Sequence, residues 1–169
     1  MAQSYRFYTL DVFTEQIFGG NPLAVFPEAQ GLTPEQMQAI AKEFNLSETV
    51  FVLPSEKVDC DFKLRIFTPN AELPFAGHPT VGTAYLLAHL GSVTPDQTMI
   101  YLEEGVGTVP VAIHWEKNRV KTTALSASQA PSFGIVPEVA IAKLLNLTPD
   151  DLAPDLNPEV ISCGLPFLY

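Results

Sequence analysis

The stretch from Arg65 to Gly91 constrains the fold of this chain more than any other part of the sequence. It begins with the alternation of a strand, continues through a loop that contains two prolines, and turns at Gly-His-Pro directly into a helical pattern. Pro79 suits the first helical turn, because the missing N–H of proline costs nothing there. The sequence therefore predicts a central helix that begins near Pro79 and ends near Gly91. Its core face is expected to hold Val81, Ala84, Leu87 and Ala88.

The start of this helix suggests a site for an anion. The first backbone N–H groups of a helix and the positive end of its dipole face the loop before it, which favours a bound negative charge. Gly77 lets the backbone come close to a ligand, and His78 adds an ionisable side chain at the same point. The sequence thus suggests a carboxylate ligand at Gly77 and His78. The alternative is a tight strand-to-helix turn with a surface histidine.

Glu48 is a second candidate, because it lies where one helix is expected to end and a buried strand to begin. The residues that follow it, Thr49 to Leu53, are strongly apolar, and Pro54 ends the run. A carboxylate at the mouth of such a strand loses part of its hydration, so its pKa is expected to rise toward neutrality. Such a group can both take up and release a proton. The alternative is an ordinary solvated glutamate in a loop.

The remaining pattern before residue 119 predicts a sheet and one more helix. Strands are expected over 5–13, 23–26, 46–53, 62–68, 98–102 and 107–115, the first two as antiparallel neighbours. Thr33, Pro34 and Gln36 combine a capping box with a proline at the first helical position, and they predict a helix that ends near Asn45. We expect residues 5–118 to form one antiparallel sheet curved around the helix that begins near Pro79.

The pattern changes from Arg119 onward. It predicts a strand over 120–125, a loose stretch, a helix over 137–146, a short helical turn at Thr148 and an extended apolar segment over 160–169. The run G-L-P-F-L-Y from Gly164 resembles G-N-P-L-A-V from Gly20, as a weak internal repeat would. The sequence predicts a first domain over 1–118 and the incomplete beginning of a similar second domain over 119–169.

Charge and composition limit the partners. Nine basic and nineteen acidic residues give a net charge of −10, which repels phosphate backbones and anionic membranes, so neither nucleic acid nor a membrane is expected. No apolar run reaches membrane-spanning length and the first residues lack a signal-peptide pattern, so a cytoplasmic location is expected. Cys60 and Cys163 have no C-x-x-C partner and predict free thiols, with neither a disulfide nor a metal site.

Three motifs together resemble a known family. They are D-V-F-T with G-G-N-P-L-A-V-F, then N-L-S-E-T-V-F-V, then R-I-F-T-P-N-A-E-L-P-F-A-G-H-P-T-V-G-T-A. They resemble the phenazine-biosynthesis isomerase family, the PhzF-like proteins, and the resemblance extends from Tyr5 to the last residue. It implies the α+β fold of diaminopimelate epimerase, in which two similar domains each wrap a strongly curved antiparallel sheet around a central helix. The active site then lies in the cleft between the domains.

The resemblance also implies a chemistry. In the phenazine enzyme a glutamate moves a proton between carbons of a dihydro-hydroxyanthranilate, without a metal or an organic cofactor. Glu48 matches that glutamate through Ser-Glu-Thr, and His78 matches the active-site histidine of the family through Gly-His-Pro. Both are therefore expected to be catalytic. The same motifs place four further residues at the substrate: Asn21, Ser47, Gly77 and Pro79.

The leading hypothesis is an isomerase that acts without a cofactor on a small carboxylate-bearing substrate, a ring or an amino acid. Glu48 would shuttle the proton while Gly77 and His78 hold the ligand. The two side chains should then stand within roughly 10 Å of each other. Related racemases use a cysteine pair, one member of which would fall in the Gly77-His78 loop, so a cysteine-pair racemase is disfavoured.

A second hypothesis is a catalytically incomplete fragment, or a small-molecule-binding protein that keeps only the anion site. Family members are nearly twice as long as this chain, and an aspartate that they use from the second domain has no counterpart here. A lone half of a cleft protein exposes apolar surface, which favours self-association, for example as a homodimer.

Overall fold

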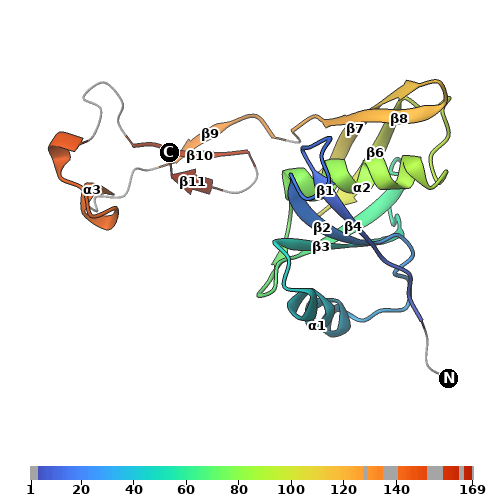
Figure 1. Ribbon diagram of the computed structural model, residues 1–169, viewed down its shortest axis with the longest axis horizontal. Helices are drawn as coiled ribbons and strands as arrows, with labels where there is room; N and C mark the ends of the chain where they lie inside the picture. Colours follow the sequence, from blue (N-terminus) through green and yellow to red (C-terminus); the bar gives the residue numbers. More distant parts are fainter. Residues whose placement is uncertain (1–3, 128, 135–140, 152–157, 164–165, 169) are drawn as a thin grey trace. The chain divides into compact units, whose positions relative to one another are not determined.

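Eight strands curl around one helix in the first part of the chain (Figure 1). The computed structural model describes residues 4–127, 129–134, 141–151, 158–163 and 166–168, and the chain divides into compact units over Met1–Ser128 and Gln129–Tyr169. The strand order in the first unit is β1-β2-β3-β4-β6-β7-β8, and β5 pairs with β4. The strands are β1 (Tyr8–Val12), β2 (Asn21–Phe26), β3 (Glu48–Pro54), β4 (Phe62–Phe67), β5 (Glu72–Leu73), β6 (Met99–Glu104), β7 (Gly107–Glu116) and β8 (Arg119–Leu125).

The sheet is mixed, whereas the sequence predicts an antiparallel one. Strands β2 and β3 run parallel, as do β4 and β6, and the other neighbouring pairs are antiparallel. Parallel strands need a crossover connection, and the two helices supply it. Helix α1 (Pro34–Phe44) connects β2 to β3, and helix α2 (Gly77–His89) lies between β5 and β6 in the chain.

Helix α2 is the buried helix that the sequence predicts. It contacts the edge strands β1 and β8 as well as β2, β3 and β7, which means that the sheet curls around it. Its core residues Val81, Ala84, Leu87 and Ala88 belong to one apolar cluster with the inward side chains of the strands. The helix starts at Gly77, two positions before the expected start, and Gly91 follows its end with a φ of 80°, a conformation that favours glycine.

Helix α1 covers the opposite face of the sheet (Figure 1). Thr33 and Gln36 form the predicted capping box, and Asn45 ends the helix in a left-handed conformation. Along β3, Val50 and Val52 face α2, while Phe51 packs in the cluster of α1. Both faces of this strand are therefore covered, which explains why its sequence is continuously apolar.

Strand β8 belongs to the first sheet, so the division between the units lies ten residues later than the expected boundary at 118/119. The pairing of β8 with β7 runs from Arg119 opposite Glu116 to Leu125 opposite Val111, and Thr123 Oγ1 donates to the carbonyl of Val81 in α2 at 2.9 Å. The Lys117-Asn118 turn is a hairpin within the domain, with both residues at positive φ. The sequence shows the turn but not which sheet the next strand joins.

The second unit contains a three-stranded antiparallel sheet with the order β11-β10-β9. Its elements are β9 (Ser132–Gly134), α3 (Ile141–Leu144), the 3-10 turn η1 (Pro149–Asp151), β10 (Val160–Ser162) and β11 (Pro166–Leu168). The helix predicted over 137–146 is described only from 141 onward, and residues 164, 165 and 169 of the predicted repeat lie outside the described residues. None of the described helices is long and apolar enough to cross a membrane.

Candidate active site

Glu48 and His78 meet, although they are far apart in the sequence. Glu48 is the first residue of β3, on the same face as Val50, and His78 is the second residue of α2. Glu48 Oε2 lies 3.3 Å from His78 Nε2, and the two side chains are 16% and 9% exposed. Both atoms are shielded from solvent, and neither has a hydrogen bond of good geometry among the described residues. The two groups therefore face each other at ion-pair distance without being committed to another partner.

Asn21 and Ser47 lie on the other side of the His78 ring. The Asn21 Nδ2 atom is 3.3 Å from His78 Nδ1, and the Ser47 hydroxyl donates to Asn21 Oδ1 at 3.2 Å. The two ring nitrogens thus have different neighbours: Nδ1 faces an amide and Nε2 faces a carboxyl group. This arrangement fixes the orientation of the ring and keeps Nε2 directed at Glu48.

Burial shifts both titrating groups toward their neutral forms. It raises the pKa of the Glu48 carboxyl group, the direction that the sequence predicts. It lowers the pKa of the His78 imidazole, while a hydrogen bond with the Pro22 carbonyl opposes that shift. Because the groups are so close, a proton bound by one affects the other, and they titrate as a pair. A carboxyl group in this setting can act as an acid or as a base near neutral pH.

The start of α2 is open toward a ligand. Ala76 is the N-cap residue, no described side chain caps this end, and the first turn carries no acidic residue. A Cβ atom added to Gly77 would meet nothing within 4 Å. Pro79 has no N–H, whereas the N–H groups of Gly77 and His78 have no acceptor within the helix. The structure brings together all six residues that the sequence nominates. Gly77, His78 and Pro79 form the first turn of α2. Glu48 and Asn21 contact His78 directly, and Ser47 contacts it through Asn21.

An aromatic loop borders the same place, and the sequence reasoning missed it. The loop between β1 and β2 exposes Phe13, Ile17 and Phe18, and the Phe13 ring lies 6.5 Å from the His78 ring, centre to centre. Phe13 and Phe18 have positive φ angles of 65° and 62°, which are uncommon for bulky residues. Asp11 Oδ2 accepts the backbone N–H of Phe18 at 2.9 Å and holds the loop. The D-V-F-T motif, Asp11 to Thr14, is the part of the sequence that could have indicated this loop.

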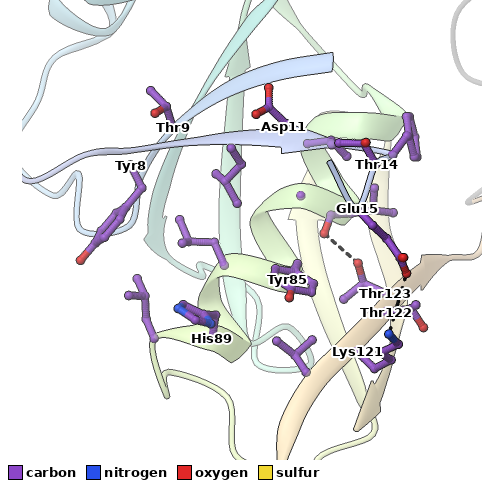
Figure 2. Close-up of a pocket in the computed structure, with 18 residues that line it drawn as sticks. Tyr8, Thr9, Asp11, Thr14, Glu15, Tyr85, His89, Lys121, Thr122 and Thr123 are labelled. Atoms are coloured by element: carbon purple, nitrogen blue, oxygen red, sulfur yellow. Dashed lines mark hydrogen bonds and ion pairs between the residues drawn. The ribbon is translucent and has the colours of Figure 1, made fainter. Parts of the chain in front are cut away.

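A cavity of about 1030 Å³ opens between the edge strands β1 and β8 and over α2, and Phe13 is among the residues that line it. Neither Glu48 nor His78 lines it. Figure 2 shows Lys121 next to Glu15 at the edge of this cavity. Their side chains form an ion pair at 3.8 Å, and Thr123 donates to the Val81 carbonyl of α2. The chemistry of the candidate site therefore lies outside this cavity.

Cys60 and Cys163 are free thiols, and both are partly buried. Within the described ranges, no group of three or more His, Cys, Asp or Glu side chains is placed to hold a metal ion. The two titratable side chains that meet at the start of α2 are Glu48 and His78.

A similar curled sheet around a helix occurs in other solved structures. The structure of a hydroxyproline epimerase from Agrobacterium vitis is similar with a TM-score of 0.62 at 13% identity, over 95% of this chain and 50% of that chain, a likeness that shows the fold alone. The family model of phenazine biosynthesis-like proteins, PhzC-PhzF, matches residues 10–169. The chain therefore belongs to the PhzC-PhzF family, and both the predicted family and the predicted fold class are confirmed.

Relatives with curated names agree with this assignment. The trans-2,3-dihydro-3-hydroxyanthranilate isomerase of Pseudomonas aeruginosa is 45% identical over 125 residues, which are 74% of this chain and 42% of that protein. The uncharacterized isomerase mll1393 of Mesorhizobium japonicum is 50% identical over 163 residues, 96% of this chain and 47% of that protein. A predicted epimerase from Pseudomonas aeruginosa, PA4716, has a structure with a TM-score of 0.84 at 34% identity, over 98% of this chain and 58% of that chain. The chain spans about half the length of the curated relatives it matches.

Proposed function

We propose that this chain carries the acid/base site of an isomerase that moves a proton on a small carboxylate-bearing substrate without a cofactor. Glu48 is the general acid and base. The observation that carries the proposal is the placement of Glu48 Oε2 at 3.3 Å from His78 Nε2, shielded from water at the open start of α2. One location thus combines a proton carrier with a site that favours an anion.

The proposed reaction is a proton transfer that leaves the substrate formula unchanged. The carboxylate of the substrate binds to the N–H groups of Gly77 and His78. Glu48 removes a proton from a substrate carbon, the electron pair of the broken C–H bond moves into a new double bond, and the existing double bond shifts. Glu48 then returns the proton to the carbon at the far end of the shifted bonds, so no electron donor or acceptor is needed. Asn21, supported by Ser47, holds the His78 ring in place.

The substrate class follows from the site and from the relatives. A positive helix end suits a carboxylate, and the Phe13 ring beside His78 offers an apolar side to the bound molecule. The relative from Pseudomonas aeruginosa is named for trans-2,3-dihydro-3-hydroxyanthranilate, which has a carboxylate on a ring. We take that compound as the first substrate to test.

A second candidate function is ligand binding without turnover. It is favoured by the open start of α2, because the N–H groups of Gly77 and His78 can hold an anion whether or not a proton is moved. Glu48 would then be a neighbour of the ligand and not a proton carrier.

One experiment separates the two. The chain is incubated with trans-2,3-dihydro-3-hydroxyanthranilate in heavy water, and NMR follows isomerisation and deuterium uptake at ring carbons, while calorimetry measures the binding of anthranilate. Isomerisation supports the proposed enzyme, and deuterium at the ring carbon reports how much of the Glu48 proton exchanges with solvent before its return. Anthranilate binding without either supports the binding protein. Absence of binding and of turnover would overturn both.

A further inference from the structure

A third carboxyl group lies close to the start of α2, and the proposed reaction does not use it. Glu104 is the last residue of β6, on the strand face that carries Ile100 and Leu102 into the core. It is only 6% exposed. Its Oε2 atom is shielded from solvent and has no hydrogen-bond partner in the part of the chain that the structure describes. A buried carboxyl group in such surroundings requires an explanation.

The hydrogen bonds of Thr80 indicate the protonation state of Glu104. Thr80 Oγ1 lies 2.7 Å from Glu104 Oε1 and 2.8 Å from the carbonyl oxygen of Ala76. Both neighbours accept hydrogen bonds if Glu104 is ionised, but a hydroxyl group has one proton to donate. Both contacts are satisfied when Glu104 is protonated: its O–H donates to Thr80 Oγ1, and the Thr80 O–H donates to the Ala76 carbonyl.

The charges around Glu104 agree with a neutral acid. Burial raises its pKa to about 7, although a hydrogen bond donated by Thr80 to the ionised form acts in the opposite direction. Glu103, the next residue along β6, lies on the other face and accepts from the Ser55 hydroxyl and from backbone N–H groups of the loop after β3. The nearby cation Lys63 pairs with Glu103, with its Nζ atom 3.6 Å from Glu103 Oε1. His78 faces Glu48. No described cation compensates a charge on Glu104.

The strand end that carries Glu104 is fixed against the loop before α2. A Cβ atom on Gly105 would come within 2.7 Å of the Pro74 Cα atom, and Val106 N donates to the Pro74 carbonyl at 3.1 Å. Glu104 is therefore held against the first turn of α2, where Thr80 and the N-cap residue Ala76 are joined by the hydroxyl bond. His78 lies between these two residues in the chain.

We propose that Glu104 is a positioning residue: as a neutral acid it donates to Thr80 and fixes the first turn of α2, and with it His78 and the N–H groups of the carboxylate site. Ionisation of Glu104 removes the donor and places a buried negative charge one turn from the bound anion, so ligand affinity falls. The ligand part of this inference rests on the proposed function, whereas the protonation of Glu104 does not.

The first test measures the protonation of Glu104 in the unliganded chain. Carbon-detected NMR is expected to show its carboxyl group titrating near pH 7, with the signal assigned by its loss in Glu104→Gln. Between the ordinary value of 4.5 and about 7 the unfolded chain has lost this proton while the folded chain keeps it, so wild-type stability falls as the pH rises through this window. Glu104→Gln is expected to show a smaller fall, because its amide donates to Thr80 at every pH and only the contribution of the raised Glu48 pKa remains.

Glu103→Gln is the matched control, since it changes the neighbouring and similarly buried glutamate. Burial raises the pKa of the Glu103 carboxyl group, but hydrogen bonds and Lys63 outweigh it and hold the pKa below the usual range. Glu103→Gln is therefore expected to keep the loss of stability with rising pH that comes from Glu104. Titration of Glu104 in the wild-type chain near the ordinary glutamate value of 4.5 would overturn the inference. This result does not depend on whether the variants fold.

The second test measures the affinity of the chain for anthranilate from pH 6 to pH 9. Wild type is expected to lose affinity through the titration of Glu104 by at least about fivefold more than Glu104→Gln, the lower end of ordinary coupling between sites. Titration of Glu48 and His78 contributes equally to both proteins. Equal pH profiles would overturn the positioning role. Absence of binding by wild type at every pH overturns the proposed function and the ligand part of this inference together, while the NMR titration still decides the state of Glu104.

Discussion

The side-chain amide of Asn21 lies 3.3 Å from Nδ1 of His78 and joins the start of β2 to the start of α2. In Asn21→Ala the ring loses this neighbour and Ser47 loses its acceptor. We expect the stability to fall by about 0.5–1.5 kcal/mol, the usual value of one hydrogen bond, because the exposed Ser47 hydroxyl can bond to water instead. Turnover should fall by roughly tenfold to a hundredfold, because a small misplacement of a reacting group is costly. Urea unfolding and isomerisation assays measure the two effects.

Gln38→Ala is a suitable control for that variant. Gln38 donates from its side-chain amide to the Thr68 carbonyl at 2.9 Å, on the α1 face of the sheet. It should lose a similar amount of stability with undiminished turnover. A parallel loss of turnover in both variants would show that Asn21 acts through general stability and not through His78.

Glu48→Gln should stabilise the fold at neutral pH. Burial raises the pKa of the folded-state carboxyl group above its ordinary value of 4.5, so the unfolded chain loses the proton first as the pH rises. Wild-type stability therefore falls between 4.5 and the raised pKa, and glutamine has no such loss. We expect a gain of about 0.5–2 kcal/mol at pH 7 that disappears below pH 4, as is common when an active-site group is replaced. Urea unfolding of both proteins at pH 7 and below pH 4 measures the difference. Equal stability of wild type and Glu48→Gln at pH 7 would contradict the expectation.

Two glycines of α2 should respond differently to alanine. A Cβ atom on Gly82 would come within 2.7 Å of Val12 Cγ2 and 2.8 Å of Leu23 Cδ2, so Gly82→Ala should cost about 1–3 kcal/mol, as overpacking does. Gly77 has open space at the same point. Gly77→Ala should therefore keep the stability and weaken the binding of anthranilate, since the methyl group stands where the ligand approaches. Unchanged binding by Gly77→Ala would remove Gly77 from the proposed site.

Phe51 should be among the most sensitive positions of the core under α1. It is fully buried, stacks on Phe26 at 5.0 Å between ring centres and meets Phe67 edge-on. Phe51→Ala should lower the free energy of unfolding by about 3–5 kcal/mol. Phe18→Ala, at a residue that is 92% exposed, should change it by less than about 0.5 kcal/mol. Comparable losses in urea unfolding would contradict the assignment of the core.

Local signals in the sequence were sufficient to predict several elements. Thr33 and Gln36 determine where α1 begins through contacts within one turn, and the apolar spacing from Val81 onward predicts a buried helix. The three motifs predict the family. Glu48 and His78 could be nominated because each lies at a change of element type, and their distance of 3.3 Å is well within the expected 10 Å. Their catalytic roles stay a proposal.

Other features depend on contacts between distant segments, which a local pattern does not contain. The parallel pairing of β4 with β6 and the pairing of β8 with β7 are decided by how the sheet closes around α2. The burial of Glu104 and its bond to Thr80 arise only when the hairpin packs on the loop at Pro74, so no local pattern in the sequence indicates them. The assignment of 119–169 to a second similar domain stays a prediction, with β8 now in the first sheet.

The rate of trans-2,3-dihydro-3-hydroxyanthranilate isomerisation in Glu48→Gln, compared with wild type, tests the central claim most directly. Glutamine keeps the shape of the side chain and removes its ability to carry the proton. We predict that turnover falls by at least ~10²-fold, the usual contribution of general acid/base catalysis, while anthranilate binds with an affinity within about threefold of wild type. Undiminished turnover in this variant would contradict the assignment of Glu48 as the group that moves the proton.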